Sequence, residues 1–448
     1  MNWLATIWRM PDLRSRILFT VGMLAAYKFG VYISAPGVDT ALLGKMLTAK
    51  TGGSSLFGLY NMFSGGALEQ FSVLVLGITP YITASIMLQI LTVVVPSLER
   101  ISKEGQQGRA RINQYTRYLT IVIALVQSFA LAKTLETQTF ENASLVVQKG
   151  LAFELVTMVT LTAGSCFVMW LGEQITERGI GNGSSLIITA GIVGGLPAAA
   201  ATLFGMVQQN SSNLLKVTLI ALGAVAVIGA IVWIERAQRR IPIQYAKKVV
   251  GRSVYGGQTS HLPLKINTTG VIPPIFASTV LTFPATIASF FPNNPFLSAI
   301  APFIAPGAWL YSYLFVVLIV FISYFYTALM FNPVDVADNL NRQQANIPDV
   351  RPGKATAEYL DRILSRLTGA GALYLAALSI MPTVLMKQYD LPFYFGGTGL
   401  LIVVGVSLDT VAQIEAQLLT RHYDGVSGPE GGPRSGRRRL SDGGEIGG

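Results

Sequence analysis

The feature that most constrains this 448-residue chain is a series of apolar runs, each close in length to a membrane-spanning helix. A helix needs about 20 predominantly apolar residues to cross the hydrocarbon core of a bilayer. Ten runs approach that length, at residues 17–34, 72–95, 117–134, 153–171, 183–203, 216–234, 271–290, 309–330, 368–386 and 395–418. Charged residues make up only 12% of the chain, whereas soluble domains carry about 25%. We therefore expect an all-α polytopic membrane protein with ten transmembrane helices.

The basic residues are distributed unevenly among the connections between these runs. An even number of spans places both termini on one side, and every arginine falls on that side, whereas the opposite side carries only lysines. Arginine and lysine concentrate in cytoplasmic connections. Both termini and the two long connections at 235–270 and 331–367 are therefore expected to be cytoplasmic. No small-residue cleavage site follows the first run, so we expect it to be a retained span.

One apolar stretch, FGLYNMFSGGALEQF at residues 57–71, is too short to cross a membrane, since even a fully helical form would measure ~22 Å. Its centre, Ser64-Gly65-Gly66, is expected to break a helix, and a spanning run follows directly. We predict that it re-enters the membrane from outside, where non-helical backbone must be buried in protein or line a cavity. The alternative is an amphipathic helix lying flat on the outer leaflet. That favours a Lys/Arg-rich polar face, and this stretch has only Glu69.

The ten runs divide into five and five around a polar connection near 205–215, a layout shared by transporters built from inverted repeats. An ion-coupled transporter of a small solute is therefore the competing class. Such a transporter needs ionisable side chains near the middle of the bilayer. Lys28 lies toward the outer end of its run, where it can snorkel, and Asp409 and Glu415 lie in the inner half of the last run. The nearly uncharged midplane disfavours this class.

No pattern of catalytic or metal-binding residues is present in the sequence. His261 and His422 lack companion ligands, and the single cysteine, Cys166, lies in an apolar run. The glycines of ERGIGNGSS, residues 177–185, lack the Gly-Lys-Ser/Thr ending of a phosphate loop. We expect a tight cytoplasmic turn there, with Asn182 or Ser184 as a helix cap. The chain is expected to have no enzymatic activity, cofactor or metal.

The long connection at 235–270 contains two alternating runs, RIPIQYA and HLPLKIN, on either side of the basic tip KKVVGRSVYGGQ. Alternation and the glycines of the tip predict a β-hairpin. A basic hairpin in the cytosol indicates a binding partner. The alternative is that basic loops simply follow the positive-inside rule, which does not require loops this long. The tail DGVSGPEGGPRSGRRRLSDGGEIGG has the composition of a disordered segment.

Two strings of the sequence stand out as long, specific motifs: SVLVLGITPYITASIMLQIL and WLGEQITERGIGNGSSLII. They resemble the two signature segments of the SecY family, the central subunit of the bacterial protein-translocation channel. The resemblance continues through YAKKVVGRSVYGGQTSHLPLKIN, GVIPPIFASTVLTFPATIASF, FYTALMFNP, PDVRPG and PFYFGGTGLLIVV, and it covers roughly residues 10–420.

The resemblance implies two pseudo-symmetric five-helix halves around an hourglass-shaped pore. They are expected here at residues 1–204 and 205–420, followed by a disordered cytoplasmic tail at 421–448. A ring of aliphatic side chains closes the waist, and its implied members are Ile82, Ile86, Ile192, Ile275 and Ile402. A short plug helix, at about 57–70, fills the outer funnel. Its implied contact and hinge residues are Phe57, Leu59, Tyr60, Met62, Phe63, Gly65 and Gly66.

The resemblance also implies a lateral gate between the second and third spans and the seventh and eighth, through which signal peptides and membrane segments reach the lipid. Its candidate polar residues are Gln89, Thr92 and Gln127. The implied protein partners are SecE, SecG, the SecA motor, the ribosome and unfolded or nascent polypeptides. Arg252 and Arg351 are the implied contacts for SecA or the ribosome, and this chain has Ser253 where many members carry a second arginine. The implied location is the bacterial inner membrane.

Overall fold

The computed structural model of the chain is mostly helical. It describes residues 10–50, 64–137, 139–140, 143–209, 213–245, 248–250, 253–255, 259–290, 308–389 and 397–427. Within these ranges, five helices are long and apolar enough to cross a membrane, or six if one bent pair is a single span. The prediction of a helical polytopic membrane protein is confirmed, and the count of ten spans stays a prediction.

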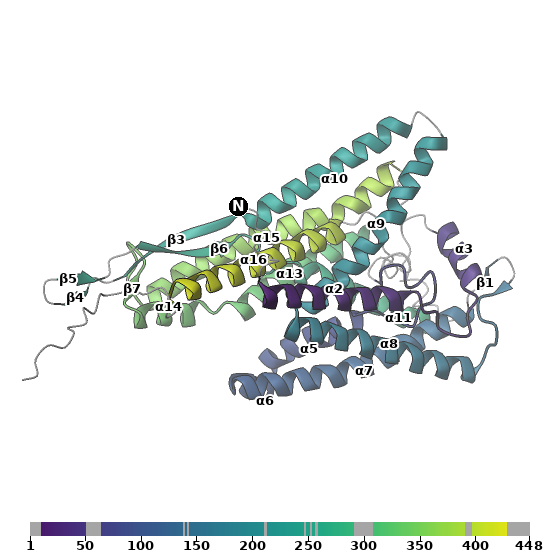
Figure 1. Cartoon of the computed structure of the whole chain (residues 1–448), viewed down its shortest axis with the longest axis horizontal. Helices are drawn as coiled ribbons and strands as arrows, with labels where there is room; N and C mark the ends of the chain where they lie inside the picture. Colours follow the sequence, from purple (N-terminus) through teal and green to yellow (C-terminus); the bar gives the residue numbers. More distant parts are fainter. Residues whose placement is uncertain are drawn as a thin grey trace, which may run out of the picture.

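The first group of helices comes from the N-terminal part of the chain. α7 packs against α5 and α8, and α2 packs against α8 and α9. A shorter helix, α3, and the strand pair β1–β2 lie at one end of the molecule (Figure 1). The bounds of these elements are α2 Pro11–Val31, α3 Thr40–Lys50, α5 Thr79–Val94, α7 Gln106–Thr137, β1 Thr139–Phe140, β2 Ala143–Ser144, α8 Leu151–Arg178 and α9 Gly183–Gln209.

The second group follows in sequence. α13 packs against α11 and α15, and α16 packs against α10 and α15. The two groups meet where α9 contacts α10 and α16 and where α11 contacts α5 and α7. The helix α9 extends to Gln209 and so continues past residue 204, where the boundary between the two halves was expected. The division of the chain into these halves stays a prediction. The bounds are α10 Asn213–Arg236, α11 Ile272–Phe290, α13 Trp309–Met330, α15 Lys354–Tyr389 and α16 Gly397–Ser427.

The second predicted span differs from its apolar run at 72–95. The helix α5 begins only at Thr79, and its 16 residues measure ~24 Å. Residues 72–78 form turns, in which the amide of Gly77 donates to the carbonyl of Leu74 at 2.8 Å. The amide of Val73 donates at 2.9 Å to the carbonyl of Ile33, in the chain that follows α2. At the other end, Pro96 begins α6 (Pro96–Lys103), which is bent 101° from α5. The residue before a proline is disfavoured in a helix, which explains why α5 stops at Val94.

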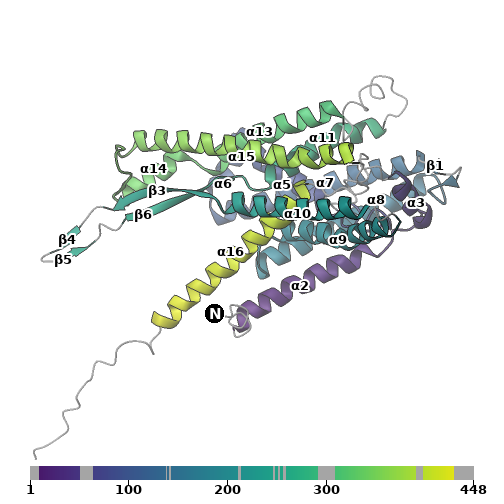
Figure 2. The same cartoon turned by 90° about the horizontal axis from the view of Figure 1, so that it is seen from above.

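The two long connections form one sheet. β3 (Gln238–Tyr245) pairs antiparallel with β6 (Thr259–Lys265), so the predicted hairpin is confirmed. The second connection contributes α14 (Pro333–Arg342) and β7 (Ala345–Asn346), and β7 pairs with the other edge of β3. A smaller hairpin, β4 (Lys248–Val250) with β5 (Ser253–Tyr255), lies at the tip, far from the helices in both views (Figures 1 and 2). The sheet and α14 lie at the end of the molecule opposite α3, with both connections on the same side.

Candidate functional site

Four of the five isoleucines predicted to form a ring belong to one apolar cluster, which we call the shared cluster. Ile402 of α16 is 1% exposed inside it, and Ile82, Ile192 and Ile275 pack against it. These side chains come from α16, α5, α9 and α11, so helices of both groups contribute. Ile86 is half-buried one turn after Ile82, outside the described members of that cluster. The structure therefore brings four residues that are distant in sequence into one apolar assembly.

The shared cluster also contains the segment that precedes α5. Within residues 64–78, the side chains of Ala67, Leu68 and Phe71 are almost completely buried and belong to this cluster. The backbone turns repeatedly, with positive φ angles of 70° at Gly65 and 89° at Gly66. Irregular backbone is thus enclosed by protein, as required at membrane depth. We call residues 64–78 the re-entrant segment; they comprise the described end of the stretch predicted to re-enter, at 64–71, and the turns at 72–78 that precede α5.

The predicted plug lies only partly within the described structure. Gly65 and Gly66 are the described members, and both adopt the left-handed conformation that favours glycine. The remaining predicted plug residues lie outside the described residues: Phe57, Leu59, Tyr60, Met62 and Phe63.

The re-entrant segment is attached to α2 and to the chain that follows α2 by hydrogen bonds of its backbone and of the Ser72 side chain. The amide of Ala35 donates to the carbonyl of Phe71 at 2.7 Å, and the Ser72 hydroxyl donates to the carbonyl of Gly30 at 2.9 Å. On α8, Gly164 allows direct contact, because a Cβ there would overlap the carbonyl oxygen of Val73. A glycine at this position explains how a spanning helix and an irregular segment approach so closely.

The line where α11 meets α5 and α7 is the boundary between the two groups that the predicted lateral gate would use. The gate candidates on α5 bond within their own helix: Gln89 Nε2 donates to Ser85 Oγ at 3.4 Å, and Thr92 Oγ1 donates to the carbonyl of Gln89 at 2.6 Å. On α7, Gln127 Oε1 is buried without a hydrogen-bond partner in the part of the chain that the structure describes. The hydrogen bonds of Gln89 and Thr92 given above therefore stay within α5 and do not cross the boundary between the two groups of helices.

The turn between α8 and α9 confirms the tight turn and the helix cap predicted for ERGIGNGSS, and its cytoplasmic location stays a prediction. Asn182 Oδ1 accepts hydrogen bonds from the amides of Ser184 and Ser185, at 3.1 and 3.4 Å, and so caps α9. The terminal helices hold the same turn: Thr20 of α2 accepts from the amide of Ile180 at 3.1 Å. Gln413 of α16 accepts from the amide of Gly181 at 3.0 Å. The turn thus joins the first and last described helices.

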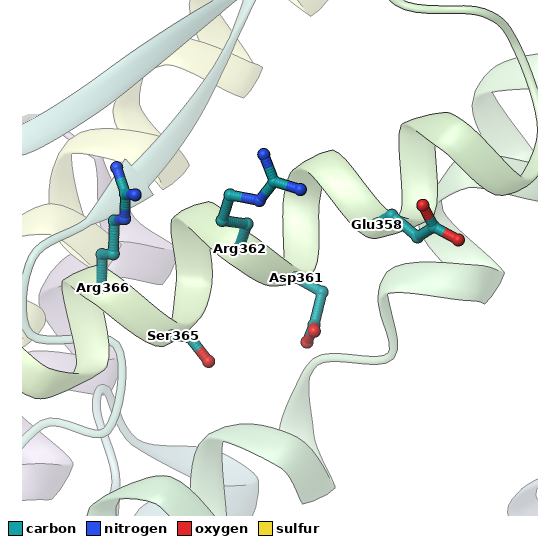
Figure 3. Close-up of a pocket in the computed structure, with 5 residues that line it drawn as sticks. All are labelled: Glu358, Asp361, Arg362, Ser365 and Arg366. Carbon is teal, nitrogen blue, oxygen red and sulfur yellow. The ribbon is translucent and has the colours of Figure 1, made fainter.

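The candidate partner-binding residues lie in the two long connections. Arg351 is exposed in the turn before α15, and its carbonyl accepts a hydrogen bond from Thr356 Oγ1 at 2.8 Å. Arg252 lies outside the described residues, next to the first residue of β5. Figure 3 shows an adjacent surface of α15, where Arg362 and Arg366 project to one side of the helix and Asp361 to the other. This end of the molecule therefore presents both basic and acidic side chains.

Two ionisable pairs lie near the ends of helices. On α6, the Lys103 ammonium donates to Glu99 at 2.6 Å and lowers the pKa of that carboxyl. Lys133 of α7 donates to the buried carboxylate of Glu154 on α8. Among the described residues, no three His, Cys, Asp or Glu side chains are grouped so that they could hold a metal ion.

The architecture and the shared cluster define a class: a helical membrane protein in which two groups of helices meet around an apolar centre that encloses a re-entrant segment. A family model described as SecY matches residues 72–411. The chain belongs to the SecY family, a family of translocase channel subunits and not of enzymes.

Relatives and solved structures agree with this assignment. The protein translocase subunit SecY of Escherichia coli (strain K12) is 47% identical over 418 residues, which are 93% of this chain and 94% of the relative. A structure reporting that the plug domain of the SecY protein stabilises the closed translocation channel and maintains a membrane seal has a TM-score of 0.64. It is 16% identical and covers 96% of this chain and 100% of its own. The structure of Sec61 in the canine ribosome–channel complex from the endoplasmic reticulum has a TM-score of 0.60 and is 15% identical. It also covers 96% of this chain and 100% of its own.

Proposed function

We propose that this chain forms a channel that passes unfolded polypeptides across a bacterial inner membrane, with both termini in the cytoplasm. The observation that carries the proposal is the meeting of Ile82, Ile192, Ile275 and Ile402, from four helices, in one cluster. A ring of branched apolar side chains excludes water and ions when closed, because a narrow apolar constriction dewets. Such a ring also has no charge or hydrogen-bonding group that would retain a passing chain. The name of the E. coli relative, a protein translocase subunit, supports this function.

The re-entrant segment supplies the second part of the proposed seal. It packs into the same cluster as the isoleucines, so the segment and the ring block the same place. Its irregular backbone has few of the repeated hydrogen bonds of a helix, and segments of this kind open at lower free energy than packed helices. We assign residues 57–70 the role of a plug that moves aside when a polypeptide enters. The plug domain named for the SecY structure above supports this assignment.

The boundary between α11 and the pair α5 and α7 is the proposed lateral gate for signal peptides and membrane segments. Gln89, Thr92 and Gln127 are its proposed polar residues. Hydrogen bonds between membrane helices contribute only about 0.6 kcal/mol on average, so a gate with few of them can open readily. The bonds of Gln89 and Thr92 within α5 are consistent with a boundary held mainly by apolar contact.

The cytoplasmic sheet and its neighbouring arginines are the proposed site for driving partners, the SecA motor or a ribosome, with SecE and SecG as the companion subunits. Arg351 is exposed on the turn that follows β7, and Arg252 belongs to the tip that β4 and β5 flank. The canine Sec61 structure, in which the channel is bound to a ribosome, supports a ribosome as partner.

The ring assignment is tested by replacing Ile82, Ile192 and Ile275 together with serine and recording ion currents across planar bilayers that hold the idle channel. Hydroxyl groups let water wet the constriction, so we expect the triple variant to leak ions while still exporting a secretory precursor. A matched control makes the same change at three exposed apolar residues of α10, which are Leu222, Val225 and Ile228. A triple variant that is as ion-tight as the control would refute the ring.

A further inference from the structure

We propose that Tyr27 and Lys28 of α2 form a latch that holds the re-entrant segment in its sealing position, and that Gly191 and Gly194 of α9 keep this latch closed. The inference rests on the proposed plug role of the segment. The latch explains why the segment rests in its sealing position. It also explains how a movement of α9 releases the segment.

The latch consists of two hydrogen bonds from α2 to consecutive carbonyls of the segment. Lys28 Nζ donates to the carbonyl of Gly65 at 3.0 Å, and the Tyr27 hydroxyl donates to the carbonyl of Ser64 at 3.3 Å. The side chain of Tyr27 is 1% exposed, so water has little access to its bond. A hydrogen bond with a charged donor is stronger than a neutral one. Lys28 is therefore the stronger of the two latch residues.

The lysine occupies a position where a charged side chain is costly. It is the only charged residue between Arg16 and Asp39, within an apolar run. A lysine near the end of a span is expected to snorkel toward the membrane surface. Here its side chain is half-buried, and the ammonium donates to the carbonyl of Gly65. Charged residues that face the interior of a membrane protein mark functional positions.

Two glycines of α9 complete the arrangement. A Cβ built on Gly65 would lie 2.8 Å from Gly191 Cα, so the segment and α9 touch through their backbones. A Cβ on Gly194 would overlap Lys28 Nζ, so the missing side chain of Gly194 provides the space for the ammonium. Gly191 and Gly194 are three residues apart and therefore lie on the same face of the helix.

This face of α9 connects the latch with the proposed ring. Ile192, one of the four isoleucines in the shared cluster, is the residue after Gly191. When an entering polypeptide pushes Ile192 outward, α9 moves with it. Gly191 then moves away from Gly65, and Gly194 moves away from Lys28. The re-entrant segment thereby loses its contact with α9. The latch therefore couples widening of the ring to release of the plug.

Two variants break the latch by different means, and a third serves as their control. Lys28→Met removes the donor and keeps a chain of similar length, and removing a charge from a span favours membrane insertion. Gly194→Ala leaves Lys28 and the segment unchanged but places a methyl group where the ammonium lies. Gly195→Ala adds the same methyl group one residue later, where nothing lies within 4 Å. Alanine favours helices over glycine, so neither α9 variant is expected to impair folding.

The direct measurement is the accessibility of the segment in the full channel in its membrane. A cysteine is placed at Ala67, which is 0% exposed, in a chain whose native Cys166 is replaced by alanine. A membrane-impermeant maleimide is added from outside, and the labelling rate of the idle channel is measured. We expect Lys28→Met and Gly194→Ala to speed labelling by at least about tenfold, the effect of losing one charge-assisted hydrogen bond. Gly195→Ala should match the parent.

Labelling rates equal to the parent in both Lys28→Met and Gly194→Ala would overturn the latch. Ion conductance of a chain lacking residues 58–66 separates this outcome from failure of the plug role. If the deletion leaks ions while the latch variants label like the parent, the plug stands and the latch is wrong. If the deletion stays ion-tight but the latch variants label faster, Lys28 holds the segment and the sealing role is wrong.

Discussion

Exchanging Gly65 for alanine should open the idle channel, and the neighbouring Gly66→Ala provides a matched comparison. Both residues have positive φ angles, 70° and 89°, which an L-residue adopts at a cost of about 1–2 kcal/mol. The two positions differ in their surroundings. A Cβ on Gly65 would lie 2.8 Å from Gly191 Cα and 3.1 Å from its carbonyl oxygen, whereas a Cβ on Gly66 meets nothing within 4 Å.

The contact at Gly65 is with backbone, which cannot rotate away as a side chain does. Overpacking of this kind costs about 1–3 kcal/mol, in addition to the cost of the φ angle. The sealing position should therefore lose about 2–5 kcal/mol in Gly65→Ala and about 1–2 kcal/mol in Gly66→Ala. The difference of about 1–3 kcal/mol corresponds to about a 5- to 150-fold larger displaced fraction.

Single-channel recording of idle channels in planar bilayers measures the displaced fraction as the fraction of time spent conducting. We expect that fraction to rise strongly in Gly65→Ala and weakly in Gly66→Ala. A thermal unfolding measurement in detergent checks that both variants remain folded. The reasoning would be refuted if the two variants conducted equally, because the contact with Gly191 is what distinguishes the two positions.

Three further outcomes are expected elsewhere in the molecule. Arg351→Glu should abolish SecA-driven export of a precursor while the chain stays inserted and folded. Export at the parental rate, with normal SecA-stimulated ATP hydrolysis, would show that Arg351 does not bind the partner. Gly164→Ala should lower stability by about 1–3 kcal/mol in detergent unfolding, because its Cβ overlaps the Val73 carbonyl, whereas Gly223→Ala, in open space, should not. Asn182→Ala should cost about 1 kcal/mol by the same measurement through loss of the α9 cap, and Asn182→Asp should restore most of it.

The elements that the sequence predicts well are those that depend on local pattern. Alternation along β3 places Ile241 and Ile243 on one buried face, and the pairing with β6 follows from that pattern. At 57–71, the short length, the central glycines and the lack of a basic face predict a stretch that does not span, and its described part, residues 64–71, is buried in the shared cluster. The side-chain cap by Asn182 is likewise a local signal.

The features that sequence reasoning missed depend on contacts between distant residues. The run from Ser72 to Ile78 is as apolar as a span, but it forms turns, and hydrogen bonds of Ser72 and Val73 to Gly30 and Ile33 hold it in a way that no local pattern reveals. β7 is only two residues long and acquires its partner from β3, about a hundred residues earlier. Lys28 was detectable as a charge within an apolar run, although its partner, the carbonyl of Gly65, was not.

The sheet β6-β3-β7 has a mechanical consequence. β3 follows α10, β6 leads into α11, and β7 precedes α15, while Ile241 and Leu264 of the sheet pack against Leu360 of α15. These helices are therefore fastened together at one end by the sheet, and the small hairpin of β4 and β5 projects beyond them (Figures 1 and 2). A force that a bound partner applies at this projecting tip becomes a torque on α10, α11 and α15 together. Because α11 is the helix that contacts α5 and α7, that torque acts on the boundary between the two groups of helices.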